Sequence, residues 1–283
     1  MKIALTGSDG MLGSDIKNVF SDVELIGLTL HDFDITDLDK SVKAIKEIKP
    51  DYLIHTAAYT DVDGSESNPE TAFLVNGIGA RNITMACEEI KCPIIYISTD
   101  YVFDGTKNEF YNEWDKPNPL NKYGLSKLMG EQFVTSLTNR FYITRTSWLY
   151  GRYGKNFIDT IIRLLSERDE IDVVNDQVGS PTYTYDLARK LRELIGRGYG
   201  TYHITNTSHC SWHEFAVEIA RVKGINKKIN PMTSEKLNRP AKRPAFSVLN
   251  NTMLKLEGIE PARHWKEALA DYLKASYPIS HIP

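Results

Sequence analysis

Two patterns of apolar and polar positions alternate along the first half of the chain. Apolar runs typical of buried strands occur in KIALTG, VELIGLTL, DYLIHTAAY, PIIYIST and FYITRTSW. Between them lie longer stretches with helical spacing, at about residues 11–20, 37–48, 69–90 and 121–134. Strands that alternate with helices of this length predict a parallel sheet covered on both faces, which is the doubly wound α/β architecture.

The second half of the chain is less regular. NPLNKYG, GSPTYTY and NRPAKRPAF are rich in proline, glycine and polar residues, so loops form more of this half. We still expect a strand near 201–205 and helices near 183–196, 211–222 and 262–273. Residues 151–283 should therefore form mainly a smaller lobe that closes over the carboxyl edge of the sheet, where ligands bind in such folds.

The loop after the first apolar run contains Gly7, Gly10 and Gly13 in the pattern GxxGxxG. Gly7 suits the tight turn that leaves the strand, Gly10 lets a pyrophosphate approach the backbone, and Gly13 lets the helix pack closely. The helix N-terminus would add amide donors and the positive end of its dipole. A glycine-rich turn without a ligand is the alternative, but the position between strand and helix favours a dinucleotide site. We therefore expect residues 1–150 to form a Rossmann-like, dinucleotide-binding domain, to which some later segments return.

The segment YGLSK places Tyr123 and Lys127 one helical turn apart, and Thr99 ends the fourth apolar run. An ordinary surface pair is the alternative. A neighbouring ammonium and a positively polarised nicotinamide would favour phenolate and lower the tyrosine pKa from its usual value of about 10. Tyr123 would then pass a proton to an oxygen as hydride reaches the adjoining carbon, while Thr99 hydrogen-bonds the same oxygen. The order of glycine turn, Thr99, Tyr123 and Lys127 favours a catalytic set.

Composition narrows the class of protein. The net charge of -3 and a pI of about 6.2 give no electrostatic case for nucleic acid or a membrane surface as partner. Cys87, Cys92 and Cys210 lack CxxC spacing and fit a reducing compartment better than a disulfide framework. The N-terminus has no signal-peptide pattern and no apolar run approaches a membrane span, so we expect a soluble, cytoplasmic protein.

Several blocks resemble, in order, those of the dTDP-4-dehydrorhamnose reductase family within the short-chain dehydrogenase/reductase superfamily. They cover about residues 1–250 and read HTAAYTDVDGSESNPETAFLVNGIGARNI, ISTDYVFDG, NPLNKYGLSKLMGE, RTSWLYG, NDQVGSPTYTYDLA and RPAKRPAFSVLN. The resemblance implies reduction of the 4-keto group of a nucleotide-activated deoxysugar by NADPH or NADH. The expected reaction converts dTDP-4-dehydro-L-rhamnose to dTDP-L-rhamnose, or is a close relative of it.

The resemblance also implies site residues. Thr99, Tyr123 and Lys127 match the catalytic set, with Asp100 beside the reacting group. Positions that match cofactor contacts are Gly7, Gly10, Met11, Leu12, Gly13, Asp34, Ile35, Ala57, Ala58, Tyr59, Asn76, Tyr123 and Lys127. Positions that match substrate contacts are Thr60, Val62, Tyr101, Trp148, Arg239 and Arg243, the two arginines being placed for the nucleotide diphosphate.

Some of these positions have ordinary structural alternatives. Asn76 would serve equally as a helix-packing amide, Trp148 as a core aromatic, and Arg239 and Arg243 as a solvated basic loop. The end of the second strand, GLTLHDFD, has neither an acid nor an arginine at the selecting position, so the preference between NAD and NADP stays open. Some family members are described as dimers bridged by magnesium. The resemblance therefore allows a homodimer, but no set of carboxylate ligands can be mapped, and we expect no metal.

Two other functions share these motifs. Sugar-nucleotide epimerases and dehydratases use the same scaffold, but the dehydratases need an Asp-Glu pair where this chain has Asp100-Tyr101. One branch that resembles the family serves as a regulatory subunit of methionine adenosyltransferase, and fold alone does not decide function. The intact set of Thr99, Tyr123 and Lys127 favours the reductase.

Overall fold

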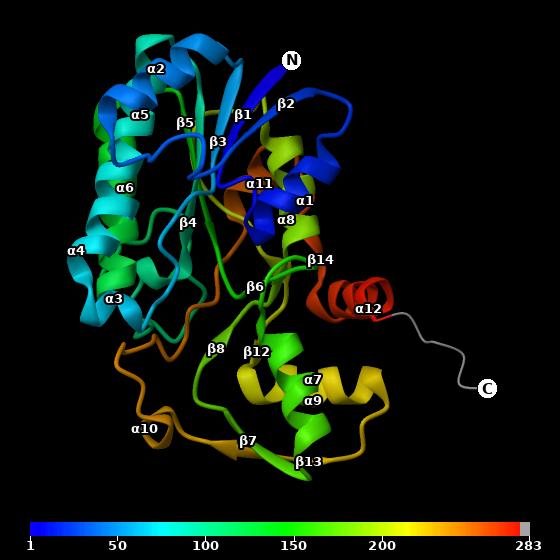
Figure 1. Cartoon of the computed structure of the whole chain (residues 1–283). Coiled ribbons are helices and arrows are strands. Elements are labelled where there is room, and N and C mark those ends of the chain that lie inside the picture. The colour runs from blue at the N-terminus through cyan, green and yellow to red at the C-terminus, as the bar shows by residue number, and fades with distance from the viewer. Residues whose placement is uncertain (278–283) are drawn as a thin grey trace.

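A parallel sheet of six strands carries helices on both faces (Figure 1). The computed structural model describes residues 1–277. The strand order is β10-β5-β4-β3-β1-β2. The strands are β1 (Lys2–Thr6), β2 (Glu24–Leu28), β3 (Tyr52–His55), β4 (Ile94–Thr99), β5 (Phe141–Thr146) and β10 (Gly200–His203). The doubly wound parallel sheet predicted from the alternating pattern is therefore confirmed.

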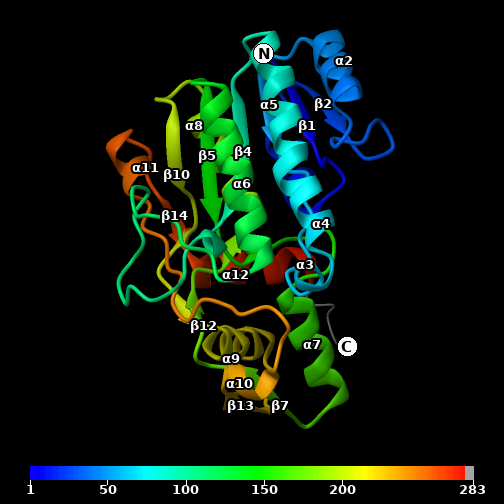
Figure 2. The ribbon, with the colours of Figure 1, turned by 90° about the vertical axis from the view of Figure 1, so that its left-hand side faces the viewer.

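Six helices divide between the two faces of this sheet (Figures 1 and 2). One face carries α1 (Met11–Val19), α8 (Thr184–Leu194) and α11 (Thr252–Leu256), and the other carries α2 (Leu38–Ile48), α5 (Ala80–Glu89) and α6 (Lys122–Leu137). Side chains alternate along β1, so that Ile3 and Leu5 face the first set of helices and Ala4 faces the second. Asp37 caps α2 by accepting a hydrogen bond from the Lys40 amide, as its position in the sequence predicts.

The helical stretch predicted over residues 69–90 is interrupted. It consists of α4 (Pro69–Ala72), a π-helical turn over Phe73–Gly79 and α5, and the short α3 (Gly64–Ser67) precedes it. Two glycines in the π-helical turn lie against large side chains. A Cβ at Gly77 would lie 2.7 Å from the Met129 sulfur, and one at Gly79 would lie 2.7 Å from Ile35. Close packing against α6 and against the loop after β2 therefore accompanies the altered helical geometry.

The remaining chain builds a smaller region below the sheet (Figure 1). Its helices are α7 (Phe157–Glu167), α9 (Trp212–Lys223), the short α10 (Ser234–Leu237) and α12 (Trp265–Ser276). Its strand pairs are β6 (Leu149–Tyr150) with β9 (Thr182–Tyr183), β7 (Glu170–Val174) with β13 (Lys228–Met232), β8 (Val178–Gly179) with β12 (Cys210–Ser211), and β11 (Asn206–Thr207) with β14 (Ala262–His264). The sequence patterns predicted α9 and α12 but not α7 or the short strand pairs.

The chain crosses between the two regions more than once. After leaving the sheet at β5, it returns to it as α8 and β10, and again as α11. Each region therefore draws on chain from beyond residue 150. In the sheet, Thr6 is level with Leu28 and His55, and Thr99 is level with Thr146. The carboxyl ends of five neighbouring strands thus reach one common edge, which faces the smaller region.

Candidate active site

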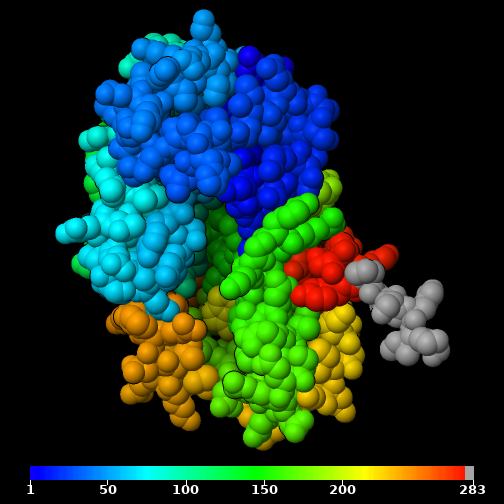
Figure 3. Space-filling view, in the orientation of Figure 1, coloured from blue at the N-terminus to red at the C-terminus, as the bar shows by residue number. Residues whose placement is uncertain are grey.

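A cavity of about 790 Å³ lies at this carboxyl edge of the sheet. Figure 3 shows a hollow between the surfaces of the early chain and the segment that follows β5. Its wall is formed by residues 6–7, 9–13, 28–30, 33–35, 56–60, 97–100 and 146–149, with Val75, Tyr123 and Lys127. Open parallel sheets bind ligands at this edge, and cavities of about 300–1,000 Å³ are usual for such ligands.

The glycine turn has the backbone geometry that the sequence predicts. Gly7 has a φ of +69°, and its carbonyl accepts a 3.1 Å hydrogen bond from the Gly10 amide. A Cβ at Gly7 would lie 2.7 Å from the Ala57 nitrogen, and a Cβ at Gly13 would collide with the Gly7 carbonyl. No side chain caps α1, and its first residues, Met11 and Leu12, line the cavity. This helix N-terminus is therefore open toward the cavity and suited to a phosphate.

Thr99, Tyr123 and Lys127 come together on one side of the cavity. Thr99 is the last residue of β4, while Tyr123 and Lys127 lie in the first turns of α6. The start of α6 is fixed by its N-cap, Asn121, whose side-chain oxygen accepts a 2.8 Å hydrogen bond from the Gly124 amide. A Cβ at Gly124 would collide with the Tyr101 carbonyl. The glycine of YGLSK thus lets α6 begin directly against the end of β4.

The expectation that Lys127 and a bound nicotinamide together lower the Tyr123 pKa stays a prediction. The neighbouring ammonium does not lower the phenol pKa in the protein by itself. Burial, reinforced by Asp100 and opposed by Thr99, raises the pKa of Tyr123 to about 12. Burial also lowers the pKa of Lys127 to about 7, against the opposite influence of Glu131. The Lys127 ammonium lies 4.3 Å from the centroid of the Tyr96 ring. Tyr123 therefore stays protonated at neutral pH.

The carboxyl of Asp100 is buried beside Thr99. Thr99 Oγ1 donates a 3.0 Å hydrogen bond to one carboxylate oxygen, and Ser247 Oγ donates a 2.5 Å bond to the other. The Tyr101 amide in turn donates to Thr99 Oγ1 at 3.2 Å. Burial raises the pKa of Asp100 to about 7, although both hydroxyl bonds act to lower it. Asp100 can therefore gain or lose a proton near neutral pH.

The turn after β2 holds two acids that lie near the expected adenine position. Asp32 Oδ2 accepts hydrogen bonds from the Thr29 amide and hydroxyl, at 2.7 and 2.9 Å. Asp34 Oδ1 accepts from the Thr36 amide and hydroxyl, at 2.9 and 2.8 Å. Asp34 and Ile35 line the cavity. Both carboxylates thus stabilise local turns of the backbone.

Most of the other predicted site residues also lie on the cavity wall, and these are Gly7, Gly10, Met11, Leu12, Gly13, Ala57, Ala58, Tyr59, Thr60 and Trp148. Asn76 does not. Its side-chain oxygen accepts from the Tyr59 amide at 2.8 Å, and its nitrogen donates to the Tyr59 carbonyl at 3.0 Å and to Ser126 Oγ at 2.9 Å. It ties the loop after β3 to α6, which is the packing role that the sequence allowed as an alternative.

Val62, Tyr101, Arg239 and Arg243 also lie outside the wall, and the two arginines converge on Asp63. The distances to Asp63 Oδ2 are 3.2 Å from Arg239 and 3.0 Å from Arg243. The Ala241 amide donates to the other carboxylate oxygen at 3.2 Å. Their role toward a nucleotide diphosphate stays a prediction. Asp63 was not singled out from the sequence, because nothing in the local pattern marks a partner so far along the chain.

Trp148 lies on the wall of the cavity and in an unusual backbone conformation. Its φ is +47°, in the left-handed region that costs free energy for a side chain of this size. Its indole stacks on Trp212, with ring centroids 3.5 Å apart and planes 5° apart. On its other side, a Cβ at Gly179 would lie 2.5 Å from the indole. Trp212 and Gly179 thus hold Trp148 in place, and neither was predicted to matter.

Residues 1–277 contain neither a metal-ligand cluster nor a membrane-spanning helix. No three His, Cys, Asp or Glu side chains in this range gather so that they could hold a metal ion. No helix in the same range is both long enough and apolar enough to cross a membrane. Cys87, Cys92 and Cys210 are buried free thiols.

Known proteins resemble this chain over nearly its whole length. The family model for the RmlD substrate binding domain matches residues 1–277. The spore coat polysaccharide biosynthesis protein SpsK of Bacillus subtilis is 38% identical, with 96% of this chain and 97% of that protein covered. The dTDP-4-dehydrorhamnose reductase of Streptomyces griseus is also 38% identical, with 96% of this chain and 92% of that protein covered.

Solved structures give the same result. A dTDP-4-dehydrorhamnose reductase from Clostridium acetobutylicum has a TM-score of 0.95 at 45% identity, over 97% of this chain and 99% of that one. The dTDP-4-dehydrorhamnose reductase from Bacillus anthracis, in complex with NADP, has a TM-score of 0.94 at 41% identity, over 97% of this chain and 100% of that one. The chain belongs to the dTDP-4-dehydrorhamnose reductase family.

Proposed function

We propose that this protein is an NAD(P)H-dependent reductase that converts the 4-keto group of dTDP-4-dehydro-L-rhamnose to a hydroxyl, giving dTDP-L-rhamnose. The observation that carries the proposal is the convergence of Thr99, Tyr123 and Lys127 on one cavity with the glycine turn. Relatives named dTDP-4-dehydrorhamnose reductase over almost the full chain support the choice of substrate. The partner of the site is thus a nucleotide sugar.

The cavity fits a dinucleotide. Gly7 and Gly13 leave the backbone free of Cβ atoms where the turn folds against Ala57 and against itself. The uncapped start of α1 would hold the pyrophosphate, and Asp34 and Ile35 would lie beside the adenine. Lys127 would bind the hydroxyls of the nicotinamide ribose. A reduced nicotinamide, when bound, supplies the hydride that forms the new C–H bond at the sugar C4.

Tyr123 would complete the reduction by protonating the keto oxygen. Its raised pKa keeps the phenol protonated before reaction, so the proton is available as negative charge develops on the oxygen. Thr99 would donate a second hydrogen bond to the same oxygen. The Lys127 ammonium, one turn along α6, would then stabilise the phenolate that remains. The keto oxygen thus gains one proton while the adjoining carbon gains one hydride.

The test is consumption of NADPH or NADH by the purified protein with dTDP-4-dehydro-L-rhamnose, followed by the loss of absorbance of the reduced nicotinamide. Stoichiometric consumption of either cofactor, with dTDP-L-rhamnose as product, would support the proposal and name the preferred cofactor. Conversion of the sugar without net cofactor consumption would point instead to an epimerase. Cofactor binding without any conversion would favour a regulatory role and contradict the proposal.

A further inference from the structure

Ser247 lies far along the chain from the candidate catalytic residues, yet its hydroxyl reaches the Asp100 carboxyl. Both residues are 2% exposed. Ser247 Oγ donates to Asp100 Oδ2 at 2.5 Å, and Thr99 Oγ1 donates to Asp100 Oδ1 at 3.0 Å. A separation this short is typical of a hydroxyl bonded to an ionised carboxylate. The Asp100 carboxyl therefore lies between the hydroxyl that faces the cavity and a hydroxyl behind it.

The segment of residues 245–250 is held on both of its sides by main-chain hydrogen bonds. On one side, the Val178 amide donates to the Ala245 carbonyl at 2.8 Å, and the Ser247 amide donates to the Val178 carbonyl at 2.9 Å. On the other side, the Tyr111 amide donates to the Val248 carbonyl at 2.9 Å, and the Asn250 amide donates to the Tyr111 carbonyl at 2.8 Å. Ser247 is thus placed by backbone pairing.

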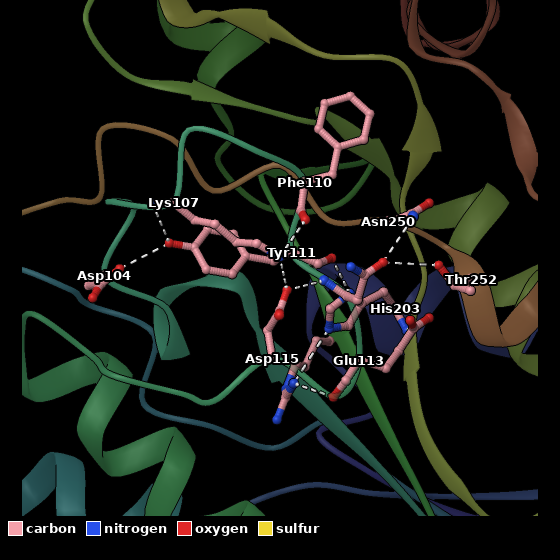
Figure 4. Close-up of polar contacts among 11 residues, drawn as sticks. Asp104, Lys107, Phe110, Tyr111, Glu113, Asp115, His203, Asn250 and Thr252 are labelled. Carbon is pink, nitrogen blue, oxygen red and sulfur yellow. Dashed lines mark hydrogen bonds and ion pairs between the residues drawn. The ribbon is translucent and has the colours of Figure 1, made fainter.

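Further contacts fix the Tyr111 side of this pairing. Figure 4 shows the Tyr111 hydroxyl beside Asp104, to which it donates at 2.9 Å, and His203 within 3.1 Å of the Tyr111 carbonyl. Asn250 and Thr252 both turn toward the same loop, where their side chains donate to Asn112 Oδ1 at 3.0 and 3.2 Å. The position of Ser247 relative to Asp100 therefore follows from a buried, well-bonded frame.

We propose that Ser247 is a positioning residue that, through the Asp100 carboxyl, turns the Thr99 hydroxyl hydrogen toward the keto oxygen of the substrate. This inference rests on the proposed function. A hydroxyl has one hydrogen to donate, and a carboxylate can only accept. While Asp100 is ionised, both hydroxyls donate to it, so the Thr99 hydrogen points away from the keto oxygen.

A proton on Asp100 changes this arrangement. Ser247 Oγ has no other hydrogen-bond partner among residues 1–277, so its hydrogen is satisfied only while Asp100 Oδ2 remains an acceptor. The acid proton is then favoured on Oδ1, from which it is donated to Thr99 Oγ1. The Thr99 hydrogen becomes free for the keto oxygen, and every hydrogen in the relay has an acceptor. Because the pKa of Asp100 is about 7, turnover should fall as pH rises through this range.

Other titratable groups lie near Asp100 and must be separated from it. Tyr101 and Tyr123 both have pKa values raised in part by Asp100, so they stay protonated where Asp100 titrates. Arg243 lies beside Tyr101 and lowers its pKa. Lys127 has a pKa of about 7, so its loss of charge would also reduce turnover as pH rises. A change confined to Ser247 separates the two titrations, because Ser247 contacts Asp100 and not Lys127.

The experiment measures kcat, KM for the sugar and cofactor Kd across pH for the wild type, Ser247→Ala, Asp100→Asn and the control Ser180→Ala. Ser180 is 1% exposed, and its hydroxyl donates to the Ser208 carbonyl at 2.9 Å, away from Asp100. Ser247→Ala removes a bond that lowers the Asp100 pKa, so the Asp100 part of the falling limb of kcat should move to higher pH. The limb should then become shallower near pH 7, where Lys127 alone still titrates. The low-pH plateau of kcat should drop roughly tenfold, because the acid proton is no longer directed to Oδ1. Cofactor Kd and KM should change little.

Asp100→Asn provides the second, nearly isosteric variant. Its amide can accept from Ser247 and donate to Thr99, as the protonated acid does, so its kcat should fall with rising pH through the Lys127 titration alone. A Ser247→Ala limb as steep as that of the wild type would overturn the inference, as would an equal change in Ser180→Ala. An Asp100→Asn limb as steep as that of the wild type would overturn it too. Wild-type turnover decides the proposed function separately, and its absence would contradict both.

Discussion

The cavity has two walls that the chain builds by different means. The sheet wall comprises the glycine turn, Thr99 and the first turns of α6, and much of its geometry is set by residues that are close together in the sequence. Gly13 packs against the carbonyl of Gly7, which lies six residues earlier in the chain. Lys127 follows Tyr123 by one helical turn. The distal wall, residues 146–149, depends on partners that are distant in sequence, such as Trp212 stacked on Trp148.

This difference suggests that the two walls have different functions. Local geometry places the cofactor turn and the proton donor on the sheet wall to within narrow limits, as chemistry requires. The distal wall is held by side-chain packing and by long-range backbone pairing. We therefore expect the rate of the chemical step to fall when the sheet wall is altered, and sugar affinity to change when the distal wall is altered.

The largest expected effect comes from Tyr123→Phe on the sheet wall. Losing the proton donor should lower kcat by about 10²–10⁴-fold, the usual contribution of general acid catalysis. Cofactor Kd should stay near the wild-type value, because the ring and the helix remain. Steady-state rates and a binding titration provide both numbers. The matched control is Tyr199→Phe, since Tyr199 is 48% exposed and packs on Tyr142 away from the cavity. Unchanged turnover in Tyr123→Phe would remove the tyrosine from the chemistry.

Gly13→Ala should have the next largest effect, on stability and cofactor binding together. The added methyl collides with the Gly7 carbonyl, which is backbone and cannot move aside freely. Overpacking of this kind costs about 1–3 kcal/mol in the free energy of unfolding. Gly10→Ala is the graded comparison, because its Cβ would lie 3.3 Å from the same carbonyl. Denaturant unfolding of both variants should rank Gly13→Ala as less stable, and the opposite ranking would contradict the close approach.

Trp212→Ala probes the distal wall. It removes the ring that stacks on Trp148, an aromatic pair worth about 0.5–1.5 kcal/mol. Trp148 should then lose its fixed position, and KM for the sugar should rise by a few-fold to about tenfold while cofactor Kd holds. Trp114→Ala is the control, because Trp114 is 64% exposed. A rise in cofactor Kd instead of sugar KM would show that the distal wall affects cofactor binding rather than sugar binding.

The smallest effect is expected from Arg239→Ala. Its side chain is 55% exposed, and it shares Asp63 with the more buried Arg243. Exposed ion pairs contribute about 0–1 kcal/mol, so stability should change little. Sugar KM tests the second use of this residue. A rise of tenfold or more would show that Arg239 also holds the nucleotide diphosphate, at roughly the strength of a charge-assisted bond.

Most of the sheet wall could be predicted from the sequence, because short local motifs specify it. Glycine spacing and the four-residue step from Tyr123 to Lys127 specify backbone geometry directly. The pKa of Tyr123 could not be inferred in this way, because it depends on burial and on Asp100, which only the packed structure brings together. The same holds for Asn76, whose side chain proved to bond the Tyr59 backbone.

Less of the distal wall could be predicted from the sequence. Trp148 was identified through a resemblance, but its partners Trp212 and Gly179 come from separate later segments. Asp63 and Ser247 are polar residues in unremarked positions, and their roles appear only when long-range pairing sets them beside Arg243 and Asp100. Helix α7 was missed although Asn156 caps it, since the surrounding loops obscured its apolar pattern.

The most direct test of the whole account follows hydrogen from the sheet wall to the sugar. The protein would be incubated with dTDP-4-dehydro-L-rhamnose and cofactor deuterated at the nicotinamide C4, and the product sugar analysed by mass spectrometry and NMR. We expect a single deuterium bonded to the sugar C4, with the hydroxyl hydrogen drawn from water through Tyr123. Deuterium retained by the cofactor while the sugar is converted, or found on another carbon, would contradict it.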